Sequence, residues 1–153
     1  DTLALNHHAK APDYNQHPEA LCGMAEKYIK EKKPALLAVC FDNPDHVGHK
    51  AGHDTPEYYA KLKELDTYVS RIVQAVKDAG MLKETIFIIT SDHGEKTMQE
   101  MQTPFIISGK NVKKGLEFHE SMMQYDVAST IAYIFGLEQP QVWIGRPMKQ
   151  VFK

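Results

Sequence analysis

The chain has 153 residues with 18 Lys and Arg against 20 Asp and Glu, giving a formal net charge of −2, and it is 42% hydrophobic and 25% charged. A domain of this length buries enough surface to fold without a disulfide or metal staple, so we expect any bound metal to serve chemistry. The even mix of charges leaves no basic stripe that could follow a nucleic-acid backbone. The apolar runs are far shorter than the roughly 20 residues of a membrane-spanning helix.

The first third of the chain predicts one helix and one buried strand. Residues 1–17 show no steady periodicity, and we expect them to be irregular. From Pro18 the apolar residues recur at helical spacing, and Pro34 ends that pattern. The continuous apolar stretch 35–41 then predicts a strand buried on both faces, as in a parallel sheet. The residues Asp42-Asn43-Pro44 predict a turn.

The rest of the chain predicts two helices and two strands. Thr55-Pro56 supplies an N-cap and a proline for a helix that runs to Gly80. Residues 85–90 are rich in β-branched and aromatic side chains and predict a second buried strand, and 104–107 predict a third. Asp126 is expected to cap a last helix over 127–135.

This order of elements predicts an α/β fold, a three-layer sandwich with helices on both faces of a mostly parallel sheet. No repeat and no linker divides the chain, so we expect a single domain over residues 1–153. The first residues do not resemble a secretory signal peptide.

Acid and imidazole side chains follow the two main predicted strands. Asp45 and His49 lie four residues apart after the first strand, around Gly48, which we expect to let the backbone turn so that both side chains point to one place. Asp92 and His93 follow the second strand. In open α/β sheets, ligands bind beyond the carboxyl ends of the strands.

Carboxylate oxygen and imidazole nitrogen are ligands of divalent ions such as zinc, which takes three or four protein ligands. Two ions about 3.5–4 Å apart can clamp the attacking and leaving oxygens of an in-line displacement at phosphorus. Either pair alone is more often a capped turn than a metal site. Two such pairs, each directly after a predicted strand, are harder to explain by chance and predict a metal centre.

The segment from Pro44 to His53, the following helix and the segment Thr90-Ser91-Asp92-His93-Gly94 together resemble the alkaline phosphatase superfamily. Within it, the likeness is to type I phosphodiesterases and nucleotide pyrophosphatases, including bacterial relatives labelled sulfatases. The resemblance implies an alkaline-phosphatase-like sandwich and a periplasmic or secreted location in a bacterium. It also implies two zinc ions, one bound by Asp45 and His49 and the other by Asp92 and His93.

The departures from the family imply that this sequence is incomplete. The family draws a further metal aspartate and its Thr or Ser nucleophile from a region N-terminal to this stretch, and nothing in residues 1–33 resembles that arrangement. Relatives also place a His-Gly-Gly loop after Asp-His-Gly, whereas here Gly94 is followed by Glu95. We therefore interpret the chain as the C-terminal half of a larger catalytic domain, incomplete in its sheet and inactive alone.

Two histidines outside the pairs have open interpretations. His119, before the last predicted helix, could supply a third zinc ligand, although a surface histidine is the simpler interpretation. His53 is expected at the rim of the site, as a substrate contact or as part of a solvated loop.

The sequence thus predicts a metal-dependent hydrolase of phosphate esters that acts through a covalent phosphoenzyme on a small phosphorylated or sulfated substrate. Zn²⁺ is the expected metal, with Ca²⁺ or Mn²⁺ as alternatives. A sulfatase of the same superfamily is one alternative function, and a non-catalytic binding module is another.

Overall fold

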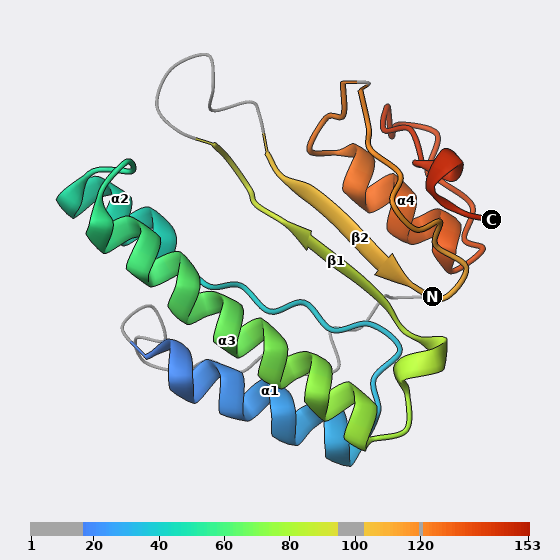
Figure 1. Cartoon of the computed structure of the whole chain (residues 1–153). Coiled ribbons are helices and arrows are strands. Elements are labelled where there is room, and N and C mark those ends of the chain that lie inside the picture. Colours follow the sequence, from blue (N-terminus) through green and yellow to red (C-terminus); the bar gives the residue numbers. More distant parts are fainter. Residues whose placement is uncertain (1–16, 95–102, 120) are drawn as a thin grey trace. The chain divides into compact units, whose positions relative to one another are not determined.

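The structure of the chain is a computed structural model, and it describes residues 17–94, 103–119 and 121–153. The chain forms two compact units, Asp1–Leu82 and Lys83–Lys153, which we call the N-terminal and C-terminal units and describe each by itself. Helices and strands are both present (Figure 1), which confirms the α/β class. The three-layer sandwich and the single domain stay predictions. The sequence analysis found no His-Gly-Gly loop after Gly94, and the residues that follow Gly94 lie outside the described ranges.

The described part of the N-terminal unit, from residue 17 onward, contains three helices, α1 (Pro18–Lys32), α2 (Asn43–Ala51) and α3 (Pro56–Asp78). The start of α3 is the one predicted, because the Thr55 hydroxyl accepts the Tyr58 N–H at 3.2 Å. Helices α1 and α3 pack side by side (Figure 1) around a small core of Cys22, Leu65 and Tyr68. This packing holds α3 in place, and α3 also packs against α2.

The predicted strand over residues 35–41 is wrong. The segment is an extended connection between α1 and α2 (Figure 1), and Leu36 is 60% exposed. A strand needs a neighbour for its backbone N–H and C=O groups, and no segment in the described part of the chain pairs with this one. Only Phe41, at its end, packs against the core of the N-terminal unit.

The C-terminal unit contains β1 (Ile86–Thr90), β2 (Phe105–Gly109) and α4 (Asp126–Ile134). The two strands pair antiparallel, with Ile86 opposite Gly109 and Thr90 opposite Phe105. Both strands were predicted, but the mostly parallel sheet is not found among the described residues. Neither strand is buried on both faces, since Ile89 and Ile106 are exposed.

The predicted cap of the last helix is also wrong. Asp126 is the first helical residue of α4, and it is fully buried. Its carboxylate accepts the Met123 N–H at 2.9 Å and the Arg146 N–H at 2.7 Å. The side chain therefore ties α4 to the C-terminal segment, because the Arg146 N–H comes from a segment 20 residues further along the chain.

Two short 3₁₀ helices, Leu82–Glu84 and Lys149–Val151, complete the described elements. None of the helices in the described ranges combines the length and the apolar character needed to cross a bilayer.

Candidate functional site

Asp45 and His49 lie on helix α2, where the sequence predicted a turn. The residues Asn43 and Pro44 begin this helix, and a proline is well tolerated in a first turn because its missing N–H would have no partner there. Asp45 and His49 are four residues apart and so share one face of the helix. The Asp45 Oδ1 atom lies 3.2 Å from the His49 Nε2 atom, and the two side chains are 44% and 51% exposed. The structure therefore brings this predicted pair together.

The sequence predicted that Gly48 would bend the backbone between these two residues, but the structure shows no such bend. It lies inside α2, is buried, and its carbonyl accepts the Gly52 N–H at 2.9 Å. The helix itself places Asp45 and His49 together, so the glycine must have another reason to be there.

Asp92 and His93 directly follow β1, as predicted. The Asp92 Oδ1 atom accepts the His93 N–H at 3.1 Å and lies 3.9 Å from the His93 Nε2 atom. On its other side, the His93 ring nitrogen Nδ1 lies 2.8 Å from the Gly94 carbonyl oxygen. A metal-binding histidine commonly donates its second ring N–H to such a carbonyl, which fixes the ring and presents Nε2 to the metal.

The donor types and spacing in α2 fit half of a zinc site. With zinc–ligand bonds of about 2.1 Å, two ligands of a tetrahedral ion lie about 3.4 Å apart. The 3.2 Å between the Asp45 and His49 atoms is close to that spacing. The 3.9 Å in the Asp92–His93 pair is wider, and that pair is solvent-exposed, with the Asp92 side chain 83% exposed.

A complete metal centre is not formed among the residues that the structure describes. In residues 17–94, 103–119 and 121–153, no three His, Cys, Asp or Glu side chains are grouped to hold an ion. His119, the predicted third ligand, is exposed in the segment between β2 and α4. Each Asp–His pair lies in a different unit, so the two-ion centre stays a prediction.

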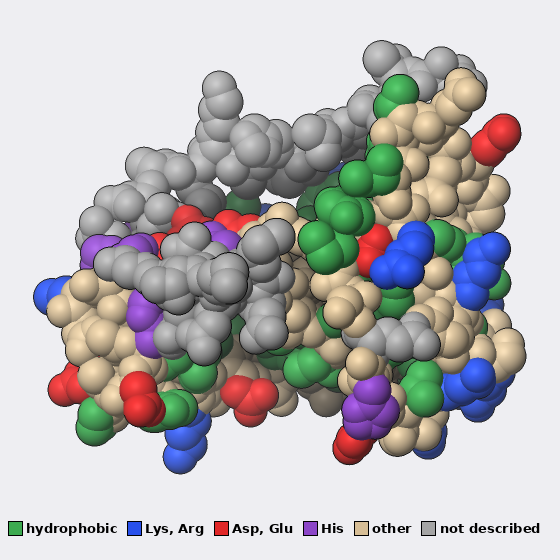
Figure 2. Space-filling view, turned by 90° about the horizontal axis from the view of Figure 1, so that it is seen from above, with side chains coloured by type: hydrophobic (Ala, Val, Ile, Leu, Met, Phe, Trp, Pro, Cys, Tyr) green, Lys and Arg blue, Asp and Glu red, His purple; other side chains and the backbone are tan. Residues whose placement is uncertain are grey.

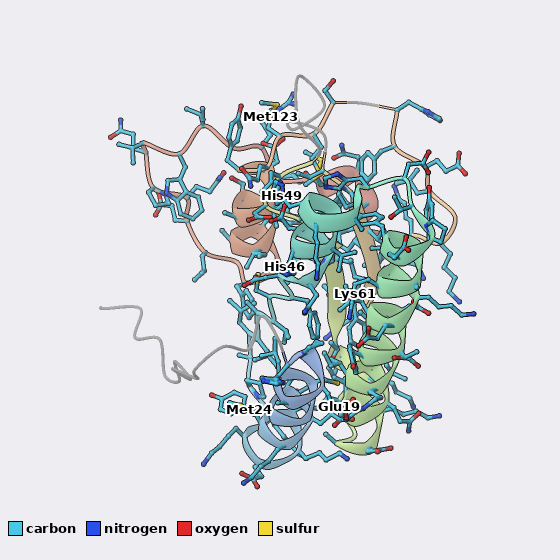
Figure 3. The ribbon with its side chains drawn as sticks, turned by 90° about the vertical axis from the view of Figure 1, so that its left-hand side faces the viewer. Glu19, Met24, His46, His49, Lys61 and Met123 are labelled. Carbon is cyan, nitrogen blue, oxygen red and sulfur yellow. The ribbon has the colours of Figure 1, made fainter. Side chains whose placement is uncertain are left out.

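The surroundings of His49 include aromatic residues that the sequence did not single out as a group. Histidine side chains, drawn purple, gather at the α2 end of the N-terminal unit, at the left in Figure 2. In Figure 3, His46 and His49 both project from α2. The His53 ring lies 6.2 Å from the His49 ring and 5.3 Å from the Tyr58 ring, in edge-to-face arrangements. Three closely spaced histidines on either side of Gly48 were the available signal.

The α/β elements and the two Asp–His pairs are the features that resemble the alkaline phosphatase superfamily, and comparison with known proteins confirms that superfamily. Residues 4–139 match the family described as "Type I phosphodiesterase / nucleotide pyrophosphatase", and the chain belongs to this family.

Two kinds of curated relative are similar to the chain. Arylsulfatase K of Bos taurus is 31% identical over 96 residues, which cover 55% of this chain and 18% of that protein. The catalytic subunit of GPI ethanolamine phosphate transferase 2 of Homo sapiens is 26% identical over 160 residues, which cover 90% of this chain and 16% of that protein. The chain therefore spans less than a fifth of the length of either relative. No solved structure gives a significant match.

Proposed function

We propose that the protein is a zinc-dependent hydrolase of phosphate esters, with Asp45, His49, Asp92 and His93 as metal ligands. The observation that carries this proposal is the pairing of Asp45 with His49 at 3.2 Å on one face of α2, in a chain of the type I phosphodiesterase family. Zinc suits this donor set better than calcium, because calcium takes oxygen ligands and two of the four residues offer nitrogen.

The described residues have distinct tasks in this proposal. Asp45 and His49 bind one ion from a rigid helix, which keeps both ligands in place without loop movement. The Gly94 carbonyl holds the His93 ring by its Nδ1 atom, and Nε2 would then be the atom that binds the second ion. Bound zinc supplies positive charge that stabilises the oxygens on which negative charge develops during displacement at phosphorus.

We further propose that the Thr or Ser nucleophile, which would form the covalent phosphoenzyme, lies outside this sequence. The relatives support this, because the chain spans only 18% of arylsulfatase K and 16% of the transferase subunit. The full-length protein is therefore the material in which activity should be measured.

A sulfatase is the second candidate, and the similarity to arylsulfatase K favours it. Phosphate and sulfate esters present similar tetrahedral groups, so the described residues do not discriminate between them. Turnover of nitrophenyl phosphate and nitrophenyl sulfate by the same preparation decides between the two functions.

The test of the proposed function measures bound metal and turnover in the full-length protein. We expect about two zinc equivalents per chain and hydrolysis of a nitrophenyl phosphate diester that stops when a chelator removes the metal. His49→Ala and Asp92→Ala should each lose metal and lower kcat by at least about 100-fold.

His46→Ala is the matched control for these substitutions. His46 is an exposed histidine on the same helix, so its replacement should keep both metal content and turnover. Turnover that survives chelation, or equal losses in His46→Ala and His49→Ala, would refute the proposal.

A further inference from the structure

The chain reverses direction after α2 and brings His53 back over that helix. Gly52 has a φ of 93°, in the region that glycine adopts without strain, and its carbonyl accepts the Thr55 hydroxyl at 2.8 Å. His53 therefore follows a fixed bend rather than the solvated loop expected from the sequence. Its ring is half-buried.

The His53 ring occupies the space beside Gly48 where any other residue would place its side chain. A Cβ atom added to Gly48 would lie 2.2 Å from the His53 Nε2 atom and 2.4 Å from its Cδ2 atom. Glycine is unfavourable inside a helix because it loses the most backbone freedom on folding, so its presence here needs a reason. The close approach of the His53 ring supplies that reason.

The same ring contacts the two elements that meet at the candidate site. It lies edge-to-face against the Tyr58 ring of α3 at 5.3 Å and against the His49 ring of α2 at 6.2 Å. The ring thus fills the space between the last turn of α2 and the first turn of α3. Removing it would leave the His49 side of α2 without this support.

We infer that His53 is a positioning residue that holds His49 toward Asp45, and that Gly48 is required in α2 to admit the His53 ring. This inference rests on the proposed function, because it takes His49 and Asp45 to be metal ligands. It assigns His53 no contact with metal or substrate.

Zinc affinity in the full-length protein tests the inference, measured by competition with a chromophoric chelator. His53→Ala should weaken zinc binding by about 10-fold to 100-fold, as expected for a residue that supports a ligand. His53→Phe keeps an aromatic ring between Gly48 and Tyr58 without any ring nitrogen, so it should retain most of the affinity. If His53→Phe loses as much as His53→Ala, the imidazole itself is needed and positioning by the ring is refuted.

A double-mutant cycle isolates the fit between Gly48 and His53. Gly48→Ala should weaken zinc binding when His53 is present, because the new methyl group displaces the ring. The same substitution should have little further effect in the His53→Ala background, where the space is empty. Equal losses in both backgrounds would overturn the inference.

A measurement without metal separates this inference from the proposed function. The Gly52 amide donates to the Gly48 carbonyl, and its hydrogen exchange reports on the last turn of α2. It should exchange about tenfold faster in His53→Ala than in the unsubstituted protein or in His46→Ala. Absence of zinc binding in the unsubstituted protein would refute the proposed function, whereas unchanged Gly52 exchange in His53→Ala would refute the role of His53.

Discussion

The two units of the chain hold their helices by different means. In the N-terminal unit, α1 and α3 are joined by Arg71, a partly exposed side chain that pairs with Glu19 at 2.6 Å and with Glu26 at 2.7 Å. Figure 3 shows Glu19 on α1, beside α3. In the C-terminal unit, polar side chains that are 0% exposed join α4 to the C-terminal segment, among them Asp126 and Thr130.

This difference bears on how each unit responds to substitution. Exposed ion pairs contribute little, because water solvates both partners when the pair is broken. A buried polar group that loses its partner has no such compensation. The C-terminal unit should therefore be the more sensitive of the two to a single change.

The buried polar residues of α4 hydrogen-bond within the helix and to later segments of the chain. The Thr130 hydroxyl donates to the Asp126 carbonyl at 2.8 Å and accepts the Met148 N–H at 3.0 Å. The Gln139 side chain donates to the Ser129 hydroxyl at 2.5 Å. Because the bonds from Met148 and Gln139 tie α4 to later segments, loss of one of them should loosen the C-terminal segment.

Asp126→Ala should have the largest effect of any substitution that tests this comparison. It removes a fully buried carboxylate and leaves the N–H groups of Met123 and Arg146 without their acceptor, and we expect a loss of about 3 kcal/mol in the free energy of unfolding. Urea denaturation measures that loss. Glu138→Ala replaces an exposed acid of the same unit and should change stability by less than about 0.5 kcal/mol. If Asp126→Ala and Glu138→Ala lose similar amounts of stability, the buried polar residues do not explain the sensitivity of the C-terminal unit to substitution.

Gly145→Ala should have the next largest effect. A Cβ atom at this position would lie 2.3 Å from the Ser129 hydroxyl oxygen and 2.6 Å from the Tyr125 carbonyl oxygen. We expect a loss of about 2 kcal/mol in thermal or urea unfolding. Adding Ser129→Ala should restore only part of it, because the clash with the backbone of Tyr125 remains.

Gly23→Ala is the matched control from the N-terminal unit. Apart from the neighbouring backbone of α1 itself, no atom of the described residues lies within 4 Å of a Cβ added to Gly23, which sits inside α1. The substitution should stabilise the protein by about 0.5–1 kcal/mol, since alanine loses less backbone freedom than glycine in a helix. If Gly23→Ala instead lowers the stability of the protein, the contrast drawn between Gly23 and Gly145 is wrong.

Local signals predicted the elements whose ends are set by nearby residues. The Thr55-Pro56 start of α3 is correct because the cap is made within one turn of the chain. Helix α2 was missed because Asn43-Pro44 was interpreted as a turn, although proline is common in a first helical turn. Residues 35–41 were wrongly predicted to be a strand because pairing depends on a partner that the apolar pattern does not contain.

The candidate site, like the fold, was predictable only where nearby residues in the sequence determine it. The residue types of each Asp–His pair follow from the sequence, and four-residue spacing would have placed Asp45 beside His49 had α2 been recognised. The approach of His53 to Gly48 was not predictable, since it depends on the bend at Gly52. The role of Asp126 was missed because one of its donors, the Arg146 N–H, comes from a segment 20 residues away.

An effect of similarly small size concerns the partly exposed ion pair between Arg71 and Glu26 in the N-terminal unit and its pH dependence. The hydrogen bond from Arg71 holds the pKa of the Glu26 carboxyl below its ordinary value of 4.5. A carboxyl with a lowered pKa in the folded state stabilises the protein above the unfolded pKa, and it loses that contribution as pH falls through the folded pKa. We therefore expect the Glu26 contribution, about 0.5–1 kcal/mol, to be present at pH 6 and to be lost as the pH falls below 4.5 and through the lowered folded pKa.

Glu26→Gln isolates this contribution from the other acids of the chain. The variant should be less stable than the unsubstituted protein at about pH 6, and the difference should shrink as both are acidified, as measured by urea denaturation at each pH. Glu31→Gln is the control, because Glu31 is an exposed acid of α1 that meets Lys27 only at 3.9 Å. A pH-dependent difference of the same size in Glu31→Gln would show that general surface charge, rather than the Arg71–Glu26 pair, causes the pH dependence.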